Sequence, residues 1–307
     1  MMKRYIAILG LAALLFQGCA DTDKIESPVQ YSLETSTKTG RAIVGGAPDY
    51  FGHVKYDAEK KLGQGVSLLD LGYLNTNGYA GRMLVFKVNL EEATIRISTP
   101  GNDTNFGRTA TLAEQFEALE NSGEEVLGGV NADSYTAATL QPTGIVWRGG
   151  SVAKGSFDGN GGFFGILKDG SAVIGSQSEY KAYSKSLYAA AGTQETILQN
   201  GYPVASSDTK ATARTFVAVD EAGTTLWLGV VDGVNFYCSN GITVADLASV
   251  LAGAGAKEAA LLQGGDASVV LARGGLSDES PFTVKNNPAG ATGKVSGCIN
   301  GLAIVSL

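Results

Sequence analysis

Two polar side chains directly follow an apolar stretch in the first half of the chain. Residues 126–130 are apolar or glycine, and Asn131 and Asp133 come next. If the strand continues, both side chains lie on one face, because alternate residues of a strand share a face. A carboxylate held there could act as a general acid, a base or a nucleophile. The alternative is a turn in which Asn131 and Asp133 cap backbone groups.

Two further motifs place a charged side chain at the end of an apolar strand. Arg214 and Thr215 begin one such stretch, and Asp232 and Gly233 follow another at residues 229–231. The guanidinium of Arg214 presents a fork of donors that matches a phosphate or a carboxylate. Asp232 is a second candidate acid. The alternatives are a solvated surface arginine and an ordinary Asp-Gly turn.

The fourth motif is rich in glycine and follows the apolar residues 259–262. It consists of Gln263, Gly264, Gly265, Asp266, Ala267 and Ser268. Consecutive glycines let backbone N–H groups approach an anion closely, so this segment could cradle a phosphate. A tight turn between two strands is the alternative.

Strand patterns dominate the segments that must position these motifs. Residues 84–90 alternate apolar with other side chains, which predicts a half-buried strand, and residues 95–97 after a short turn predict its hairpin partner. Residues 163–167 and 172–174 flank Asp169-Gly170, a favoured two-residue hairpin turn. Residues 215–219 and 225–231 flank a further turn at residues 221–223.

Two helices carry clear start signals. Thr111 and Glu114 have the spacing of a capping box, and Thr243 and Asp246 repeat it. Apolar residues then recur on one face of each segment, and Gly253 is expected to end the second helix. Each helix leads into an apolar strand among many hairpins. The sequence therefore predicts an α+β fold: a single domain with a mixed or antiparallel sheet, many hairpins and a few packed helices.

Composition excludes several classes of protein. The chain has 307 residues, of which 44% are hydrophobic and 17% charged, so wholesale disorder is excluded. The formal net charge is −7 and no basic patch is evident, so we expect no nucleic-acid partner. The single histidine, His53, excludes a metal site with two histidines and is expected to have a surface or structural role.

The N-terminal residues have the proportions of an export signal. Lys3 and Arg4 precede the mostly apolar residues 5–16, which are too few to span a bilayer as a helix. Gly18 and Cys19 then resemble the end of a bacterial lipoprotein signal. We expect a signal peptide at 1–18, lipidation of Cys19, a flexible tether at 19–39 and the folded domain at 40–307. An ordinary signal peptide with an incidental cysteine is the alternative.

An exported, lipid-anchored protein would face the periplasm or the cell surface and would contact the membrane through Cys19. Export also permits a disulfide between Cys238 and Cys298. The sequence leaves open whether these two cysteines pair or remain free thiols.

The order and spacing of the motifs resemble the phosphodiester glycosidase family, which includes the enzyme that uncovers mannose 6-phosphate by removing N-acetylglucosamine. The resemblance covers roughly residues 80–307. The matching segments, in order, are Asn131 to Tyr135, Asn200-Gly201, Ala213-Arg214-Thr215, Asp232-Gly233, Gly241-Ile242-Thr243, Leu261 to Ser268, Asn287-Pro288 and residues 302–305.

The chain departs from the family pattern at several positions. Gln263 stands where the family has a carboxylate, and it cannot act as a base or a nucleophile. Asp266 replaces a glycine and Ala267 replaces a serine. Ser134-Tyr135 replaces a pair of aromatic residues. Asp266 could supply the missing charge from a shifted position.

The resemblance implies hydrolysis of the bond between the anomeric carbon of a sugar and a phosphodiester oxygen. The candidate catalytic residues are Asp133, Asp232, Arg214 and Asp266. Arg214 would stabilise the phosphate, and the carboxylates would serve the oxocarbenium-like sugar. The expected substrate-binding residues are Asn131, Thr215, Gly233, Gln263, Gly264, Gly265 and Ser268. The reaction as written requires no metal or other cofactor, and the sequence does not decide whether a metal ion binds.

The expected activity is release of a free sugar, of the N-acetylglucosamine type, and a phosphomonoester. Cell-wall or glycan phosphodiesters would be natural substrates for an exported lipoprotein. Two alternatives stay open at this point. One is a non-catalytic lipoprotein that binds a sugar phosphate or glycan at a degenerate site. The other is a hydrolase of altered specificity that cleaves on the other side of phosphorus.

Overall fold

The computed structural model describes residues 30–235, 238–274, 281–288 and 295–307. The chain divides into two units, Met1–Tyr31 and Ser32–Leu307. Nearly all of the first unit lies outside the described residues, so the expected signal peptide and the lipidation site Cys19 do as well. No helix among the described residues has the length and apolar character needed to cross a bilayer.

Three antiparallel sheets build the second unit. The large sheet has eight strands in the order β1 (Phe51–Gly63), β2 (Val66–Asn75), β3 (Ala80–Asn89), β16 (Thr225–Val231), β15 (Arg214–Val219), β19 (Glu258–Leu261), β13 (Glu195–Gln199) and β14 (Tyr202–Pro203). The second sheet has the order β21 (Phe282–Val284), β20 (Val270–Arg273), β5 (Val126–Asn131), β22 (Gly301–Ser306) and β4 (Ala93–Ser98). The third sheet has the order β11 (Ala172–Gly175), β10 (Phe163–Leu167), β12 (Leu187–Gly192), β8 (Val146–Arg148) and β9 (Ser151–Lys154).

Smaller elements complete the described fold. Two short ribbons pair β6 (Tyr135–Thr136) with β7 (Gln141–Pro142), and β17 (Val234–Asn235) with β18 (Ser239–Asn240). The helices are α1 (Lys38–Gly46), α2 (Leu112–Glu120), α3 (Tyr180–Tyr183) and α4 (Val244–Gly253), with 3₁₀ turns η1 (Pro100–Asn102) and η2 (Gly265–Ala267). Together with the antiparallel sheets, these helices confirm the α+β prediction.

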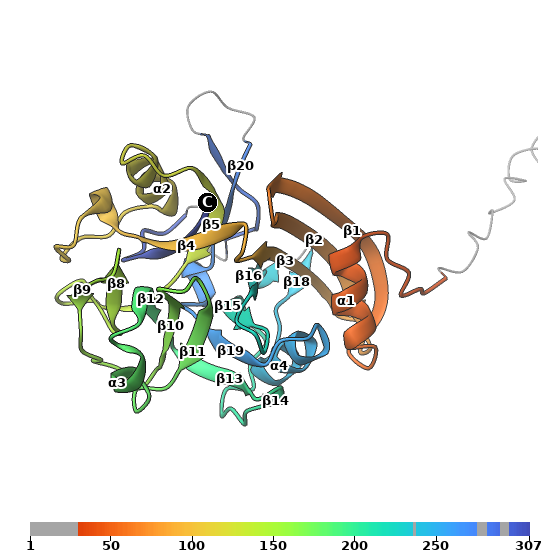
Figure 1. Cartoon of the computed structure of the whole chain (residues 1–307). Helices are drawn as coiled ribbons and strands as arrows, with labels where there is room; N and C mark the ends of the chain where they lie inside the picture. Colours follow the sequence, from red (N-terminus) through yellow and green to blue (C-terminus); the bar gives the residue numbers. More distant parts are fainter. Residues whose placement is uncertain (1–29, 236–237, 275–280, 289–294) are drawn as a thin grey trace, which may run out of the picture. The chain divides into compact units, whose positions relative to one another are not determined.

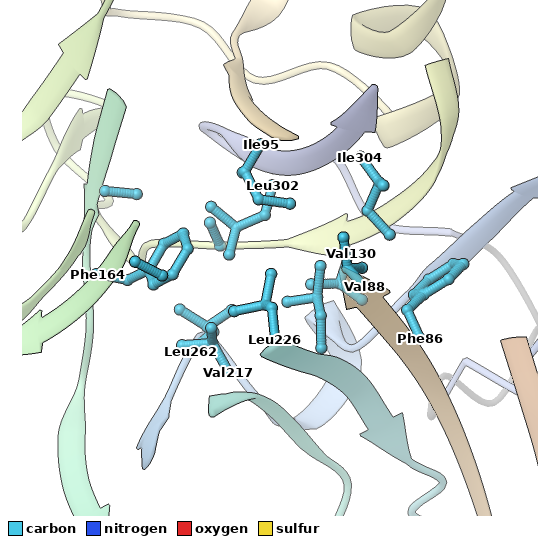
Figure 2. Packing of buried hydrophobic residues seen from close by; sticks show 14 of the residues in the cluster. Phe86, Val88, Ile95, Val130, Phe164, Val217, Leu226, Leu262, Leu302 and Ile304 are labelled. Carbon is cyan, nitrogen blue, oxygen red and sulfur yellow. The ribbon is translucent and has the colours of Figure 1, made fainter. Parts of the chain in front are cut away.

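The core lies where the inner faces of the three sheets meet. Figure 2 shows Val217 and Leu226 of the large sheet, Val130 and Leu302 of the second sheet and Phe164 of the third in this cluster. A second apolar cluster fills the space between the outer face of the large sheet and the helices α1 and α4, which lie together in Figure 1. The helix α2 covers the outer face of the second sheet. Strands between these layers are therefore buried on both faces.

This double burial corrects the prediction of a half-buried strand at residues 84–90. Leu84 and Phe86 of β3 point into the core between the sheets, whereas Met83 and Val85 pack under the helices, and all four are buried. A sheet covered on both faces needs apolar side chains at consecutive positions. The alternating apolar residues in the sequence indicated only the face of the strand that packs in the core between the sheets.

Two of the three predicted hairpins are confirmed and one is wrong. The strands β10 and β11 pair across Asp169-Gly170, and β15 pairs with β16 across the turn that contains Gly223. The strands β3 and β4 do not pair, although a short turn joins them. Among the described pairings, β3 bonds to β2 and β16, and β4 bonds to β22 of the second sheet. The turn after β3 therefore carries the chain from one sheet to another.

Both predicted helices begin at the expected caps. Thr111 and Glu114 form the reciprocal capping box of α2, and the Thr243 side chain accepts the amide of Asp246 at the start of α4. Gly253 is the last residue of α4, as predicted. Both helices lead directly toward the strands β5 and β19, whose far ends carry polar motifs. Each helix therefore leads the chain into a strand that ends at a polar motif.

The folded unit begins earlier than residue 40, where the sequence placed its boundary. Thr37 caps α1, and the amides of Ser36 and Thr37 donate to the Asp57 carboxylate on β1 at 2.7–3.0 Å. The amide of Ser32 contacts the His53 ring at 3.0 Å. His53 therefore has a structural contact, and residues 32–39 belong to the domain rather than to a tether.

Candidate active site

Six strands, three from the large sheet and three from the second sheet, have one end at the same side of the fold. Because neighbouring strands are antiparallel, this side contains the C-terminal ends of β5, β16 and β19 and the N-terminal ends of β15, β20 and β22. The registers agree, since Asn131 pairs with Gly301 and Arg214 pairs with Val231. The four motifs singled out in the sequence all lie at these strand ends.

Asn131 is the centre of a buried hydrogen-bond network. Its Oδ1 accepts the Thr215 hydroxyl at 3.1 Å and the Val269 amide at 3.0 Å, and its Nδ2 donates to the Gln263 carbonyl at 2.7 Å. Ser268 Oγ lies 3.0 Å from Thr215 Oγ1. Asn131, Thr215 and Ser268 are fully buried or nearly so. The structure therefore brings together three predicted binding residues and the backbone of Gln263.

Asp133 lies two residues beyond Asn131 and is fully buried. Its Oδ1 accepts the Thr143 hydroxyl at 2.9 Å, and its Oδ2 accepts the Gly144 amide at 2.7 Å. Its own amide donates to Asn300 Oδ1 at 2.8 Å. Burial raises the pKa of Asp133 to about 6, although the bonds from Gly144 and Thr143 favour the ionised form. A carboxyl with this pKa can exchange a proton near neutral pH.

Asp232 is the second buried carboxylate of the site. The Asn287 amide donates to its Oδ1 at 2.9 Å, the Asn287 side chain donates to its Oδ2 at 3.2 Å, and Arg82 Nη1 lies 3.6 Å from Oδ2. Burial raises the pKa of Asp232, and the Asn287 amide and the charge of Arg82 act against that rise. Arg82 is also held by Asp70 through two short bonds of 3.0 and 2.7 Å.

Asn286 connects Asp232 with the Asn131 network. Its Nδ2 donates to the Ser268 carbonyl at 3.0 Å and its Oδ1 accepts the Val270 amide at 2.8 Å. Its side chain also lowers the pKa of Asp232 and so favours the ionised carboxylate. Hydrogen bonds thus link Asn286 to Asn131 through Ser268 and Thr215, and Asn287, the next residue, bonds to Asp232.

Arg214 does not join this network. Its neighbour Thr215 points inward to Asn131, and adjacent side chains of a strand point to opposite faces. Arg214 therefore lies on the side of α4, where Nη1 donates to Asp208 at 2.8 Å, Nη2 to the Lys210 carbonyl at 2.7 Å and Nε to the Ile242 carbonyl at 3.4 Å. The side chain is buried, and each of its three nitrogens donates one hydrogen bond.

The glycine-rich motif forms a turn, and some of its amides donate hydrogen bonds to backbone carbonyls. The Gly265 amide donates to the Ala213 carbonyl at 3.1 Å, and the Gln263 amide donates to the Ala132 carbonyl at 2.8 Å. Gly265 has a φ of +65°, a backbone conformation that favours glycine. Asp266 is exposed on η2, so the structure does not place this third candidate in the buried network. Gly233 is buried directly after Asp232.

The two remaining cysteines are free. Cys298 is buried and its sulfur lies 3.3 Å from Gln115 Nε2, whereas the sulfur of Cys238 lies 3.2 Å from Asn287 Nδ2. They therefore occupy different surroundings, and the disulfide that the sequence left open is not formed. Among the described residues, no group of three or more His, Cys, Asp or Glu side chains could hold a metal ion.

The sequence predicted no functional role for several residues of the site: Arg82, Thr143, Asp208, Asn286, Asn287 and Asn300. The pair Asn286-Asn287 before Pro288 was a detectable polar signal, because the family pattern closes on such a segment. Arg82 and Thr143 gave none, because no local pattern shows that their side chains approach Asp232 and Asp133. A cavity of about 620 Å³ lies elsewhere, between the β10–β11 hairpin and β13, and none of the predicted site residues lines it.

The sequence of the chain matches one known protein family. The model of the phosphodiester glycosidase family matches residues 124–303, which is more than half of the sequence. The matched segment begins just before β5 and ends within β22, so it includes every predicted catalytic and substrate-binding residue. The chain therefore belongs to the phosphodiester glycosidase family.

Solved structures share the fold at low sequence identity. The catalytic domain of zebrafish N-acetylglucosamine-1-phosphodiester alpha-N-acetylglucosaminidase, auto-inhibited by its pro-peptide, matches with a TM-score of 0.60 and 18% identity over 77% of this chain and 81% of that chain. A hypothetical protein from Synechocystis matches with a TM-score of 0.57 and 12% identity over 82% of this chain and 64% of that one. A Burkholderia pseudomallei protein described as exported matches with a TM-score of 0.55 and 13% identity over 74% of each chain. No curated protein sequence matches the chain significantly.

Proposed function

We propose that this protein is an exported hydrolase that cleaves the sugar C1–O bond of a sugar-1-phosphodiester. Water would add to C1, and the phosphate would leave as a phosphomonoester. The name of the zebrafish enzyme supports an N-acetylglucosamine-type sugar as the first substrate to test. Family membership supports the reaction class.

One observation carries the proposal: the family's motif residues lie together, near buried carboxylates, at the strand ends on one side of the fold. Asn131, Thr215 and Ser268 are contiguous through hydrogen bonds, and Asp133 follows two residues after Asn131. Buried polar networks that are fully bonded hold their members in fixed positions. Such positions are what an enzyme needs to orient a sugar against a carboxylate.

The chemistry assigns different tasks to the two carboxylates. The phosphomonoester leaves as an anion, so it needs little protonation, whereas the oxocarbenium-like sugar needs a nearby negative charge or a base for water. Asp133, with a pKa of about 6, would take the proton from the attacking water or attack C1 itself. Asp232, held by Asn287 and Arg82, would contribute fixed charge. Arg214 would stabilise the phosphate only after releasing Asp208.

The test is incubation of the full-length protein with an N-acetylglucosamine-1-phosphodiester, with free sugar and phosphomonoester assayed separately. We expect both products, and we expect Asp133→Asn to reduce turnover by at least about 100-fold while the fold persists. Asp169→Asn, in the exposed β10–β11 turn, is the matched control and should retain activity. Full activity of Asp133→Asn would remove Asp133 from the mechanism.

A binding protein without catalysis is the second candidate function. It is favoured by Gln263, which stands where the family has a carboxylate, and by the engagement of Arg214 with Asp208. Substrate that binds wild type and Asp133→Asn equally, without products from either, would support it. Release of a phosphorylated sugar would instead indicate cleavage on the other side of phosphorus.

We further propose that the protein is a lipoprotein anchored through Cys19. The support is the sequence pattern of residues 1–19, together with the exported Burkholderia protein of the same fold. Mass spectrometry of the mature N-terminus in a bacterial host tests this. A lipid-modified Cys19 is expected, and Cys19→Ala should release the protein from the membrane fraction. A mature chain that starts at another residue without lipid would contradict the proposal.

A further inference from the structure

A small cavity lies where the second sheet meets the third, apart from the candidate active site. Its volume is about 170 Å³, and its lining includes Arg96 of β4, Arg148 at the end of β8, Asn102, Glu124 and Tyr188. The strand β4 contacts both β8 and β12, which carry Arg148 and Tyr188 (Figure 1). A water molecule takes up about 30 Å³ in the liquid, so the cavity has room for a small ion and a few waters.

Arg148 brings a positive charge to this cavity without an ionised partner. Its Nε donates to the Ile97 carbonyl at 3.0 Å, its Nη1 to the carbonyls of Asn102 and Asp103 at 3.0 and 3.5 Å, and its Nη2 to Asn102 Oδ1. These acceptors are uncharged, and no carboxylate in the described part of the chain forms an ion pair with Arg148. Burial lowers the pKa of Arg148, and the charge of Asp103 does not offset that effect. An anion beside the guanidinium would stabilise its charge.

Arg96 supplies a second guanidinium to the lining. Its Nε donates to Glu124 Oε1 at 2.7 Å, and its Cζ lies 5.2 Å from the centroid of the Tyr188 ring. Among the described residues, no acceptor takes a hydrogen bond from Nη1 or Nη2 of Arg96. Glu124 is the only acidic residue in the lining, so the charged side chains around the cavity carry one net positive charge. This excess is local, because the whole chain has a formal net charge of −7.

The lining matches an oxyanion in charge and in hydrogen bonding. Guanidinium groups present N–H donors in a fork that binds two oxygens of a phosphate or a carboxylate. A phosphate has enough oxygens to accept hydrogen bonds from two arginines at once, whereas a carboxylate has two. Glu124 already occupies one donor of Arg96, so it competes with any anion that enters.

We propose that Arg96 and Arg148 form a phosphate-binding site in the cavity between β4, β8 and β12. This site is separate from the proposed hydrolysis, because none of the candidate catalytic or substrate-binding residues lines the cavity. Inorganic phosphate and the phosphate group of a small phosphomonoester present the same chemistry to the two guanidinium groups.

The test is titration calorimetry of the full-length protein with inorganic phosphate, glycerol 3-phosphate and acetate at constant ionic strength. Glu124→Gln removes the competing carboxylate and should strengthen phosphate binding about threefold. Glu120→Gln is its matched control, because Glu120 pairs with Arg273 outside the cavity. Arg148→Gln should weaken phosphate binding at least about tenfold, and Arg273→Gln is the control for the lost positive charge.

The two controls should bind phosphate as wild type does. Phosphate that enters the proposed active site would respond to none of the four substitutions, so an effect confined to the cavity variants belongs to this site. Unchanged affinity in both cavity variants, or acetate that binds as tightly as phosphate, would overturn the proposal. If Arg148→Gln melts too low for titration, Glu124→Gln decides, because it leaves the contacts of Arg148 in place. Tighter binding of glycerol 3-phosphate than of inorganic phosphate would identify a phosphomonoester as the ligand, and the reverse order would identify inorganic phosphate.

Discussion

Arg214 and Asp208 form an ion pair in which Nη1 and Oδ2 are 2.8 Å apart. The guanidinium side chain is only 9% exposed, whereas the carboxylate side chain is 41% exposed. The Lys210 carbonyl takes a second donor of the same guanidinium. Asp208 thus occupies Arg214 as a substrate phosphate would, because both groups are anions with paired oxygens. A phosphate that is to bind Arg214 must displace a carboxylate of this same chain.

Asp208→Asn should therefore strengthen the binding of phosphate. The substitution keeps the size of the side chain and removes the competing charge, and a pair with one exposed partner contributes about 0.2–1 kcal/mol. We expect inorganic phosphate to bind or inhibit roughly two- to fivefold more tightly, as measured by its inhibition constant. An unchanged constant, together with a lower melting temperature, would make the pair purely structural. Asp158→Asn, which removes the partner of Lys154, serves as the control.

Asn131→Ala should destabilise the fold more than most single substitutions. The change leaves the Val269 amide and the Gln263 carbonyl buried without their partner. Two such groups should reduce the free energy of unfolding by about 2–4 kcal/mol, measured by urea denaturation. Asn240→Ala, at an exposed asparagine that bonds to the Ala80 carbonyl, is the control and should lose far less. Equal losses would show that the Asn131 network contributes little.

The raised pKa of Asp133 should make stability depend on pH in a defined direction. Its pKa is about 6 in the fold against an ordinary 3.8, so between these values the folded chain binds more protons than the unfolded chain. The free energy of unfolding therefore falls as pH rises from about 4 to about 6, by about 3 kcal/mol from this group. Asp133→Asn should remove that slope. A wild-type curve that rises over this range, with no change in the variant, would contradict the prediction.

Asn287→Ala should shift the part of the pH profile of activity that depends on ionisation of Asp232. The variant loses the side-chain bond to Asp232 Oδ2 but keeps the backbone amide bond to Oδ1. Because the lost bond favours the ionised carboxylate, the pKa of Asp232 should rise further. The acidic limb of the kcat/KM profile should shift to higher pH with little change in the melting temperature. An unmoved limb would mean that Asp232 does not titrate in the reaction.

Local sequence determined much of the fold because its signals act over a few residues. Capping at Thr111 and Thr243 fixed where two helices begin, and the glycine turns at residues 169–170 and 221–223 fixed two hairpins. The predicted hairpin between residues 84–90 and 95–97 was wrong because local signals do not show which strands pair. A short turn and two apolar strands look alike whether the strands pair or separate into two sheets. Only the competition among all strands for partners decides between these outcomes.

The sequence also identified the polar residues at strand ends, since a buried strand that delivers Asn131, Asp133 or Asp232 is visible as an apolar run followed by a polar side chain. It could not show which of them meet. The tertiary structure joined Thr215 to Asn131 and turned the adjacent Arg214 toward Asp208, because consecutive strand residues face opposite sides of the sheet. Contacts between distant segments depend on sheet order and register, which no local pattern encodes.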